Sequence, residues 1–308
     1  MYRQRRYDEC IKEVKSKLKK NPDSLHLLNY QAMAYSALKR DKEALLSYQK
    51  IIKNDPKLAG PYYNMGIILR RNERVEEAIS NYRKAISLKP DYVQAYNNLG
   101  VLYKDNEEYE NAIEMFTKAK ELQPDHQNSY YNLALIKKEQ GLNEEAIELL
   151  LKVIDLNPEH SKASLLLTTT GTDLGIKFHK EGKHKSALKY FKVVNILEPK
   201  EHLGFYNVGN SYLELEDFEN AKVNFEKALT LKPKYEPALG NLAVAYRNLG
   251  KIDKSLRCSN EAIKINTQNP GNYYNKAITL REVERTEDAE ENYRKAIHLD
   301  PKHIGSYR

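Results

Sequence analysis

The stretch at residues 91–124 reads DYVQAYNNLGVLYKDNEEYENAIEMFTKAKELQP, and it decides the fold of the chain. Each half carries apolar or small residues three and four positions apart, a spacing that places them on one face of an α-helix. These residues are Tyr96, Leu99, Gly100 and Tyr103 in the first half and Ala112, Ile113, Phe116 and Ala119 in the second. Asp105 and Asn106 suit a turn, and Pro124 stops the second helix because it lacks an N–H. The stretch therefore predicts two amphipathic helices joined by a turn.

The same pattern recurs in a fixed frame of 34 residues. We expect full repeats at 23–56, 57–90, 91–124, 125–158, 159–199, 200–233, 234–267 and 268–301, a half repeat at 1–22 and the start of a further repeat at 302–308. The spacing of Tyr, Leu, Gly, Ala, Phe and Pro resembles that of the tetratricopeptide repeat (TPR) family. The resemblance implies an all-α fold, a single right-handed superhelix, or solenoid, of stacked helix pairs. Both ends fall within a repeat, which favours a piece of a longer chain or a subunit of a complex.

Charge and cysteine content exclude several classes of protein. The net charge is +7, but residues 1–22 supply +5 of it, with eight Lys and Arg against three acids. The near balance elsewhere argues against nucleic-acid binding. Cys10 and Cys258 stand far apart, so we expect no disulfide framework and a reducing, cytoplasmic location. The apolar runs are too short for membrane insertion, and no signal peptide is visible.

Two repeats depart from the pattern. The repeat at 159–199 is seven residues longer than the frame, and the excess lies in 161–172. Seven residues are close to two helical turns, so the first helix could be extended in phase. The Thr-rich run LLLTTTGT has poor helix propensity, so a loop or kink is an equal alternative, and we expect any irregularity there. In the repeat at 234–267, Ser255 and Ser259 replace packing residues, which predicts a more loosely packed second helix.

The sequence contains no catalytic motif. A phosphate-binding Gly-rich loop, a CxxC pair, an HExxH motif and a nucleophile elbow are all missing, so we expect no enzyme activity and no cofactor. Acidic clusters recur where second helices begin, as the helix dipole favours. Four histidines at 160, 179, 184 and 202 lack the i, i+4 spacing of metal ligands, so we expect surface histidines and no metal site.

One helical register holds asparagine in most repeats. The register lies two residues before the small Gly or Ala of the first helix, and we call its members the amide row: Asn64, Asn98, Asn132, Asn207, Asn241 and Asn275. At 100° per residue the amide row points away from the packing face. The row resembles that of the TPR region of O-linked N-acetylglucosamine transferases, which implies amides that hold the backbone of an extended peptide. The alternative is duplication of an Asn that bonds neighbouring helices.

Aromatic and basic residues accompany the amide row. Tyr63, Tyr131, Tyr206 and Tyr274 lie one residue before it, and Arg70, Lys104, Lys138, Arg247 and Arg281 lie on the same side. We expect all of them to line the peptide-binding surface and to favour partners with acidic residues. The family's two-carboxylate clamp needs Lys and Asn at set positions, and only Asn210 fits, so that subtype is disfavoured.

These observations predict a non-enzymatic scaffold that binds an extended segment of a protein partner in a concave groove. Two alternatives stay open. The chain could be the substrate-recruiting arm of an enzyme such as a glycosyltransferase, or a structural subunit of a large assembly such as a ciliary or transport complex.

Overall fold

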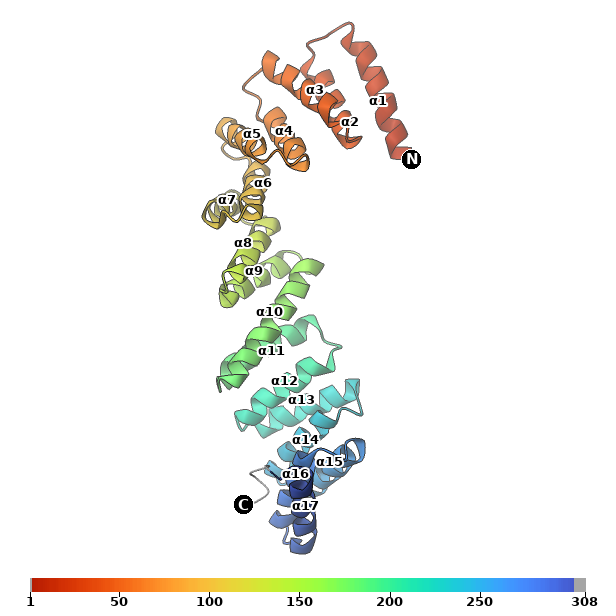
Figure 1. Cartoon of the computed structure of the whole chain (residues 1–308), viewed down its shortest axis with the longest axis vertical. Helices are drawn as coiled ribbons and strands as arrows, with labels where there is room; N and C mark the ends of the chain where they lie inside the picture. The colour runs from red at the N-terminus through yellow and green to blue at the C-terminus, as the bar shows by residue number, and fades with distance from the viewer. Residues whose placement is uncertain (1, 302–308) are drawn as a thin grey trace. The chain divides into compact units, whose positions relative to one another are not determined.

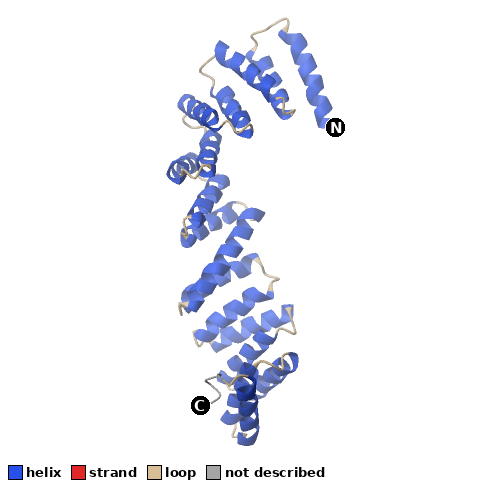
Figure 2. Ribbon diagram, viewed as in Figure 1, coloured by secondary structure: helices blue, strands red, loops and turns tan. Residues whose placement is uncertain are grey.

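The computed structural model describes residues 2–301, and the expected start of a further repeat at 302–308 lies outside them. Figure 2 shows helices and loops throughout the described residues and no strand. The helices, labelled in Figure 1, are α1 (Tyr2–Leu18), α2 (Leu25–Ala37), α3 (Asp41–Asn54), α4 (Ala59–Arg71), α5 (Val75–Leu88), α6 (Val93–Asp105), α7 (Tyr109–Leu122), α8 (Gln127–Glu139), α9 (Asn143–Leu156), α10 (Ser161–Lys180), α11 (His184–Leu197), α12 (His202–Glu214), α13 (Phe218–Leu231), α14 (Glu236–Asn248), α15 (Ile252–Ile265), α16 (Pro270–Glu282) and α17 (Thr286–Leu299). The prediction of an all-α repeat fold is confirmed.

The helices form two compact units, Met1–His160 and Ser161–Arg308, and each is described by itself. In the first unit α1 packs on α2, and the pairs α2–α3, α4–α5, α6–α7 and α8–α9 follow. In the second unit the pairs are α10–α11, α12–α13, α14–α15 and α16–α17. Each pair consists of a first helix with an even number and a second helix with an odd number.

A glycine of the first helix seats an aromatic ring of the second in several pairs. A Cβ on Gly100 of α6 would lie 2.8 Å from the Phe116 ring of α7, closer than packed atoms allow. Phe116 is fully buried as a result. Gly66 with Tyr82 and Gly209 with Phe225 repeat the arrangement. In these pairs the missing Cβ of the glycine allows the ring to approach closely, and the ring buries a large apolar surface.

The turn within each pair uses one left-handed residue after the first helix. Gly141, Gly182 and Gly250 fill this place in three pairs, with φ between 70° and 76°. In five other pairs a charged residue fills it: Lys39, Glu73, Glu107, Glu216 and Glu284. A residue with a Cβ is less stable in this conformation than glycine. The hydrogen bonds that close the turn, such as Glu108 N to Tyr103 O at 2.8 Å, offset that cost.

The extra seven residues lengthen a helix. α10 is continuous from Ser161 to Lys180, so the extended-helix alternative is correct and the expected irregularity at 161–172 is wrong. The helical spacing of the apolar residues outweighs the low helix propensity of the Thr-rich run. Ala163, Leu167 and Leu174 lie on one face of the helix and are buried. Gly171 also packs tightly: a Cβ there would lie 3.1 Å from the Val194 side chain of α11.

The second helix with two serines is regular. α15 has the same length as its counterparts, and Ser255 and Ser259 are both buried. The Ser255 hydroxyl donates to the Ala243 carbonyl at 2.8 Å and shares a 3.1 Å hydrogen bond with Thr279. The Ser259 hydroxyl is buried without a hydrogen-bond partner among residues 2–301. One serine therefore replaces apolar packing with hydrogen bonds, whereas the other does not.

Candidate functional site

Within each unit the first helices face one side and contact each other directly. α4 packs on α6 and α6 on α8 in the first unit, and α12 packs on α14 and α14 on α16 in the second. Successive second helices do not approach one another as closely in the described part of the chain. The first-helix side is therefore the more crowded, inner side of each unit, and the amide row lies on the first helices.

The amide row makes hydrogen bonds from one first helix to the preceding one. Asn98 of α6 donates through Nδ2 to the Tyr63 hydroxyl of α4 at 3.2 Å. In unit two, Asn241 of α14 donates to Asn210 Oδ1 of α12 at 2.7 Å, with the Tyr206 hydroxyl at 3.5 Å. A longer contact of the same kind joins Asn132 to Asn97 Oδ1 at 3.5 Å. Each of these amides thus reaches the residue one place before the preceding member of the row.

The other members of the row differ. The Asn64 amide lies beside the Tyr48 hydroxyl and partly offsets the burial that raises the pKa of Tyr48 to about 12. Asn207 and Asn275 make no side-chain hydrogen bond within residues 2–301, and the register that holds Tyr63 or Tyr206 for other members of the row holds Thr172 and Gly240 for these two. No Oδ1 atom of the six accepts a hydrogen bond from the described part of the chain. All six residues of the row are half-buried.

The four tyrosines beside the row are half-buried and pack against other rings. The ring partners are Tyr92 for Tyr63 at 4.8 Å, His160 for Tyr131 at 5.1 Å, Tyr235 for Tyr206 at 5.2 Å and Tyr293 for Tyr274 at 5.9 Å between centroids. Burial raises the pKa of Tyr63, and the Asn98 hydrogen bond lowers it in part. Tyr63 and Tyr206 also accept hydrogen bonds from the amide row, and only part of each of the four rings is accessible.

Three of the five basic residues form ion pairs with acids of the same chain. Arg70 pairs with Asp105 of the next repeat at 3.0 Å, and Lys104 pairs with the same carboxylate at 2.9 Å. Arg247 pairs with Glu282 at 3.4 Å in the same manner. Lys138 and Arg281 are exposed and form no ion pair within residues 2–301. Sequence reasoning missed the acids, although they stand one residue after the basic register in the next repeat.

Two histidines that are separate in the sequence pattern meet at a turn. The Nδ1 atoms of His179 and His184 lie 3.4 Å apart across the α10–α11 turn. The described residues contain no cluster of three or more His, Cys, Asp or Glu side chains that could hold a metal ion. The pair joins the two helices at the edge of the first-helix side.

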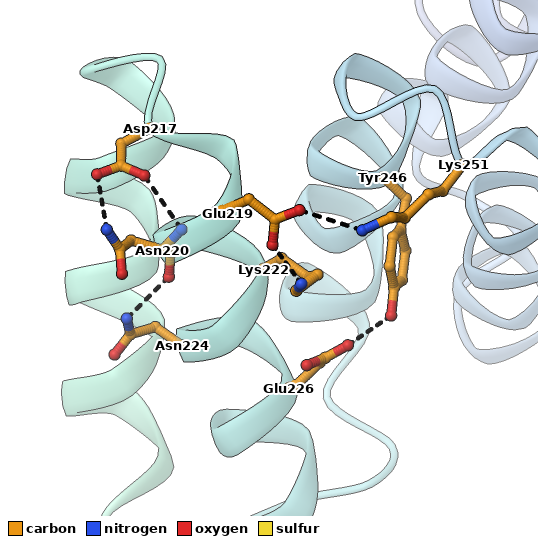
Figure 3. A network of polar contacts seen from close by, with 8 residues as sticks. All are labelled: Asp217, Glu219, Asn220, Lys222, Asn224, Glu226, Tyr246 and Lys251. Carbon is orange, nitrogen blue, oxygen red and sulfur yellow. Dashed lines mark hydrogen bonds and ion pairs between the residues drawn. The ribbon is translucent and has the colours of Figure 1, made fainter.

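A polar network on α13 and α14 joins consecutive repeats, away from the amide row (Figure 3). The Tyr246 hydroxyl of α14 donates to Glu226 of α13 at 2.5 Å, and Lys251 reaches Glu219 at 3.1 Å. Burial raises the pKa of Tyr246, and the carboxylate raises it further. In unit one Tyr103 takes this place, and it accepts from Arg83 at 2.6 Å. A tyrosine at this register therefore links repeats whatever the charge of its partner.

Comparison with known families agrees with this architecture. Models described as tetratricopeptide repeat match residues 93–126, 127–160, 203–235, 236–269, 270–303, 47–80 and 30–57, and one described as TPR repeat matches 68–107. The chain belongs to the tetratricopeptide repeat family. TPR proteins are protein–protein interaction scaffolds and are typically not enzymes. The matched ranges leave 161–202, where α10 is lengthened, between them.

Two curated relatives share part of the TPR array. BBSome complex member BBS4 of Bos taurus is 27% identical over 121 residues, 39% of this chain and 23% of the relative. The Mus musculus protein of the same description is 29% identical over 108 residues, 35% of this chain and 21% of the relative. The chain thus spans less than a quarter of the length of these relatives.

Solved TPR structures are also similar. The crystal structure of MamA aligns with a TM-score of 0.47 at 26% identity, covering 51% of this chain and 91% of MamA. YrrB, described as a TPR protein with an unusual peptide-binding site, aligns with a TM-score of 0.42 at 28% identity, covering 62% and 95%. Among residues 2–301, no helix of this TPR protein has the length and apolar character needed to span a bilayer.

Proposed function

We propose that this TPR protein is a non-enzymatic scaffold whose amide row binds extended segments of a protein partner. The observation that carries the proposal is the unused Oδ1 acceptor at all six positions of the row. An extended peptide presents an N–H and a C=O at every residue, and a primary amide can pair with either. Such binding tolerates many partner sequences, because backbone groups are the same in all of them.

The hydrogen bonds between repeats support this proposal. Asn98 and Asn241 donate through Nδ2 within the chain and keep an Oδ1 acceptor for a partner. The in-chain bond holds the amide in one orientation, so less side-chain freedom is lost when a partner binds. The two units each carry three members of the row, and each set is proposed to hold a segment of its own.

The test separates binding from stability by comparing two pairs of amides. Twelve-residue peptides selected by display on the full chain serve as ligands, and their affinities are measured by fluorescence anisotropy. A net hydrogen bond is worth about 0.5–1.5 kcal/mol, so Asn207→Ala with Asn275→Ala should weaken binding by roughly 5- to 150-fold. The melting temperature should stay unchanged, because neither amide has an in-chain bond to lose.

Matched variants complete the test. Asn98→Ala with Asn132→Ala should weaken binding in unit one and also lower the melting temperature, because bonds between repeats are lost. Asn260→Ala, at an exposed place on α15, should change neither. Full affinity in the Asn207→Ala and Asn275→Ala variant would contradict the proposal.

A second function is favoured by the likeness to BBS4, which is described as a BBSome complex member. In this proposal the chain is a subunit of a multiprotein assembly and binds through the outer faces of its second helices. Purification of the tagged full chain from source cells, with and without the Asn207→Ala and Asn275→Ala changes, distinguishes the two. An assembly that survives these changes favours the second function.

A further inference from the structure

The inner side of unit two contains a small cavity. It has a volume of about 90 Å³ and lies between α10, α11 and α12. Its lining residues are Ile176, His179 and Lys180 of α10, Phe191 of α11, and Asn207 and Asn210 of α12. The cavity therefore lies beside a member of the amide row that has no in-chain hydrogen bond.

The cavity coincides with a local change in packing. α10 and α12 approach each other less closely than α12 and α14 do. The register that offers Tyr63 or Tyr206 elsewhere holds Thr172 in α10, so Asn207 is left without the acceptor that Asn98 has. The lengthened repeat thus leaves both space and an unbonded amide in one place.

The walls of the cavity suit an aliphatic side chain. Phe191 is 3% exposed, and Gly175 holds its ring in place, since a Cβ on that glycine would lie 2.6 Å from it. Ile176, also in the lining, is 40% exposed, so part of its apolar surface is open to a bound side chain. Small-molecule pockets usually measure about 300–1,000 Å³, so a cavity of this size accepts a single side chain and not a cofactor.

The lining of the cavity includes Lys180 and no acidic residue. Lys177 and Lys180 are exposed, and neither forms an ion pair within residues 2–301. Nearby Glu181 already pairs with Lys183 at 2.7 Å. Asp173, a turn before Lys177, is the acid closest in sequence on α10. Lys180 thus lines the cavity and no acid does, and a carboxylate on a bound segment would complement it.

We propose that this cavity anchors the partner segment in unit two. One aliphatic side chain enters between Ile176 and Phe191, Asn207 bonds the segment's backbone next to that side chain, and Lys180 pairs with an acidic neighbour. The inference rests on the proposed peptide-binding function and adds the chemistry of the partner: an extended segment with an aliphatic residue next to an acid.

The experiment uses a random twelve-residue display library on the full chain and two variants. Ile176→Trp fills the cavity, and Val244→Trp places the same ring at the same register of α14 as a matched control. Peptides selected on the unmodified chain and on Val244→Trp should share an aliphatic residue within two positions of Asp or Glu. Replacing that aliphatic residue by Ala should weaken binding about tenfold or more, and Ile176→Trp should abolish the difference.

A second variant keeps the test valid if Ile176→Trp fails to fold. Lys180 is exposed, so Lys180→Glu should leave the fold intact and should shift the selected peptides from acidic to basic neighbours. Selected peptides with no aliphatic preference, or the same preference on Ile176→Trp, would overturn the anchor. Peptides whose affinity depends on Asn207 and Asn275 but not on Ile176 would support binding by the amide row and would contradict the anchor. Recovery of no peptide at all would overturn both proposals.

Discussion

At the scale of single residues, the amide row combines two roles in one side chain. The Asn98 Nδ2 atom bonds the preceding repeat, while its Oδ1 atom has no donor among residues 2–301. Asparagine is a poor helix-interior residue, so its recurrence needs a cause. The hydrogen bonds between repeats are a structural cause. The unused acceptors are the reason for proposing a second role in peptide binding. For this reason we expect replacement of Asn98 to lower both the melting temperature and the affinity, and replacement of Asn207 to lower the affinity alone.

Buried tyrosines give the protein a predicted sensitivity to high pH. Burial raises the pKa of Tyr48 to about 12 and also raises that of Tyr82, and the nearby amides of Asn64 and Asn98 offset part of each rise. Each folded-state pKa lies above the ordinary value of 10. The stability contributed by the neutral rings is therefore complete below pH 10 and is lost as the pH rises toward 12.

The Tyr48→Phe/Tyr82→Phe variant should lose less of its melting temperature between pH 10 and 12 than the unmodified protein. Near pH 7 the Tyr82 change should cost little, because Phe116 and Phe225 fill the same register in other repeats. Tyr30→Phe serves as the control, since Tyr30 is 58% exposed. An identical alkaline decline in the double variant would contradict the explanation.

At the scale of helices, the glycine of a first helix and the ring of its second helix are in direct contact. α6 and α7 combine Gly100 with Phe116, whereas the same two registers in α8 and α9 hold Ala134 and Leu150, both fully buried. The combined volume of the two residues is thus similar in these two pairs, although the residue at each register differs.

A double-mutant cycle tests this size compensation. Gly100→Ala should cost about 1–3 kcal/mol, because the added methyl group collides with the ring. Phe116→Leu should also destabilise the pair, but the two changes together should cost less than their sum by at least about 0.5 kcal/mol. Urea unfolding measures all four free energies. Additive costs would show that Gly100 and Phe116 do not constrain each other.

At the scale of the whole molecule, stability should vary along the array, because repeats contact their neighbours and can open locally. α15 is the weak element, since Ser259 is buried at the register that holds Phe116 in α7, and its hydroxyl has no partner in the described chain. We expect faster amide hydrogen exchange in Ile252–Ile265 than in residues 112–122. Equal protection of the two segments, measured by mass spectrometry in one sample, would refute the expectation.

The sequence by itself determined the helix pairs and their repeat. Apolar spacing, the stop prolines and the Gly at one register are local signals, and they recur so often that the fold follows from them. The family resemblance is confirmed for the same reason. The sequence also located the amide row, because a register is defined by counting along a helix.

Only the tertiary structure decided which groups of that row are available. Whether an amide has a partner depends on the residues of the preceding first helix: Tyr63 accepts from Asn98 and Asn210 accepts from Asn241, whereas no residue of α10 accepts from Asn207 within residues 2–301. The acids that neutralise Arg70 and Arg247 also come from the next repeat. Helix propensity left 161–172 open, and burial of Leu167 and Leu174 settled it as helix. Such contacts depend on how closely two helices approach, which no single helix encodes.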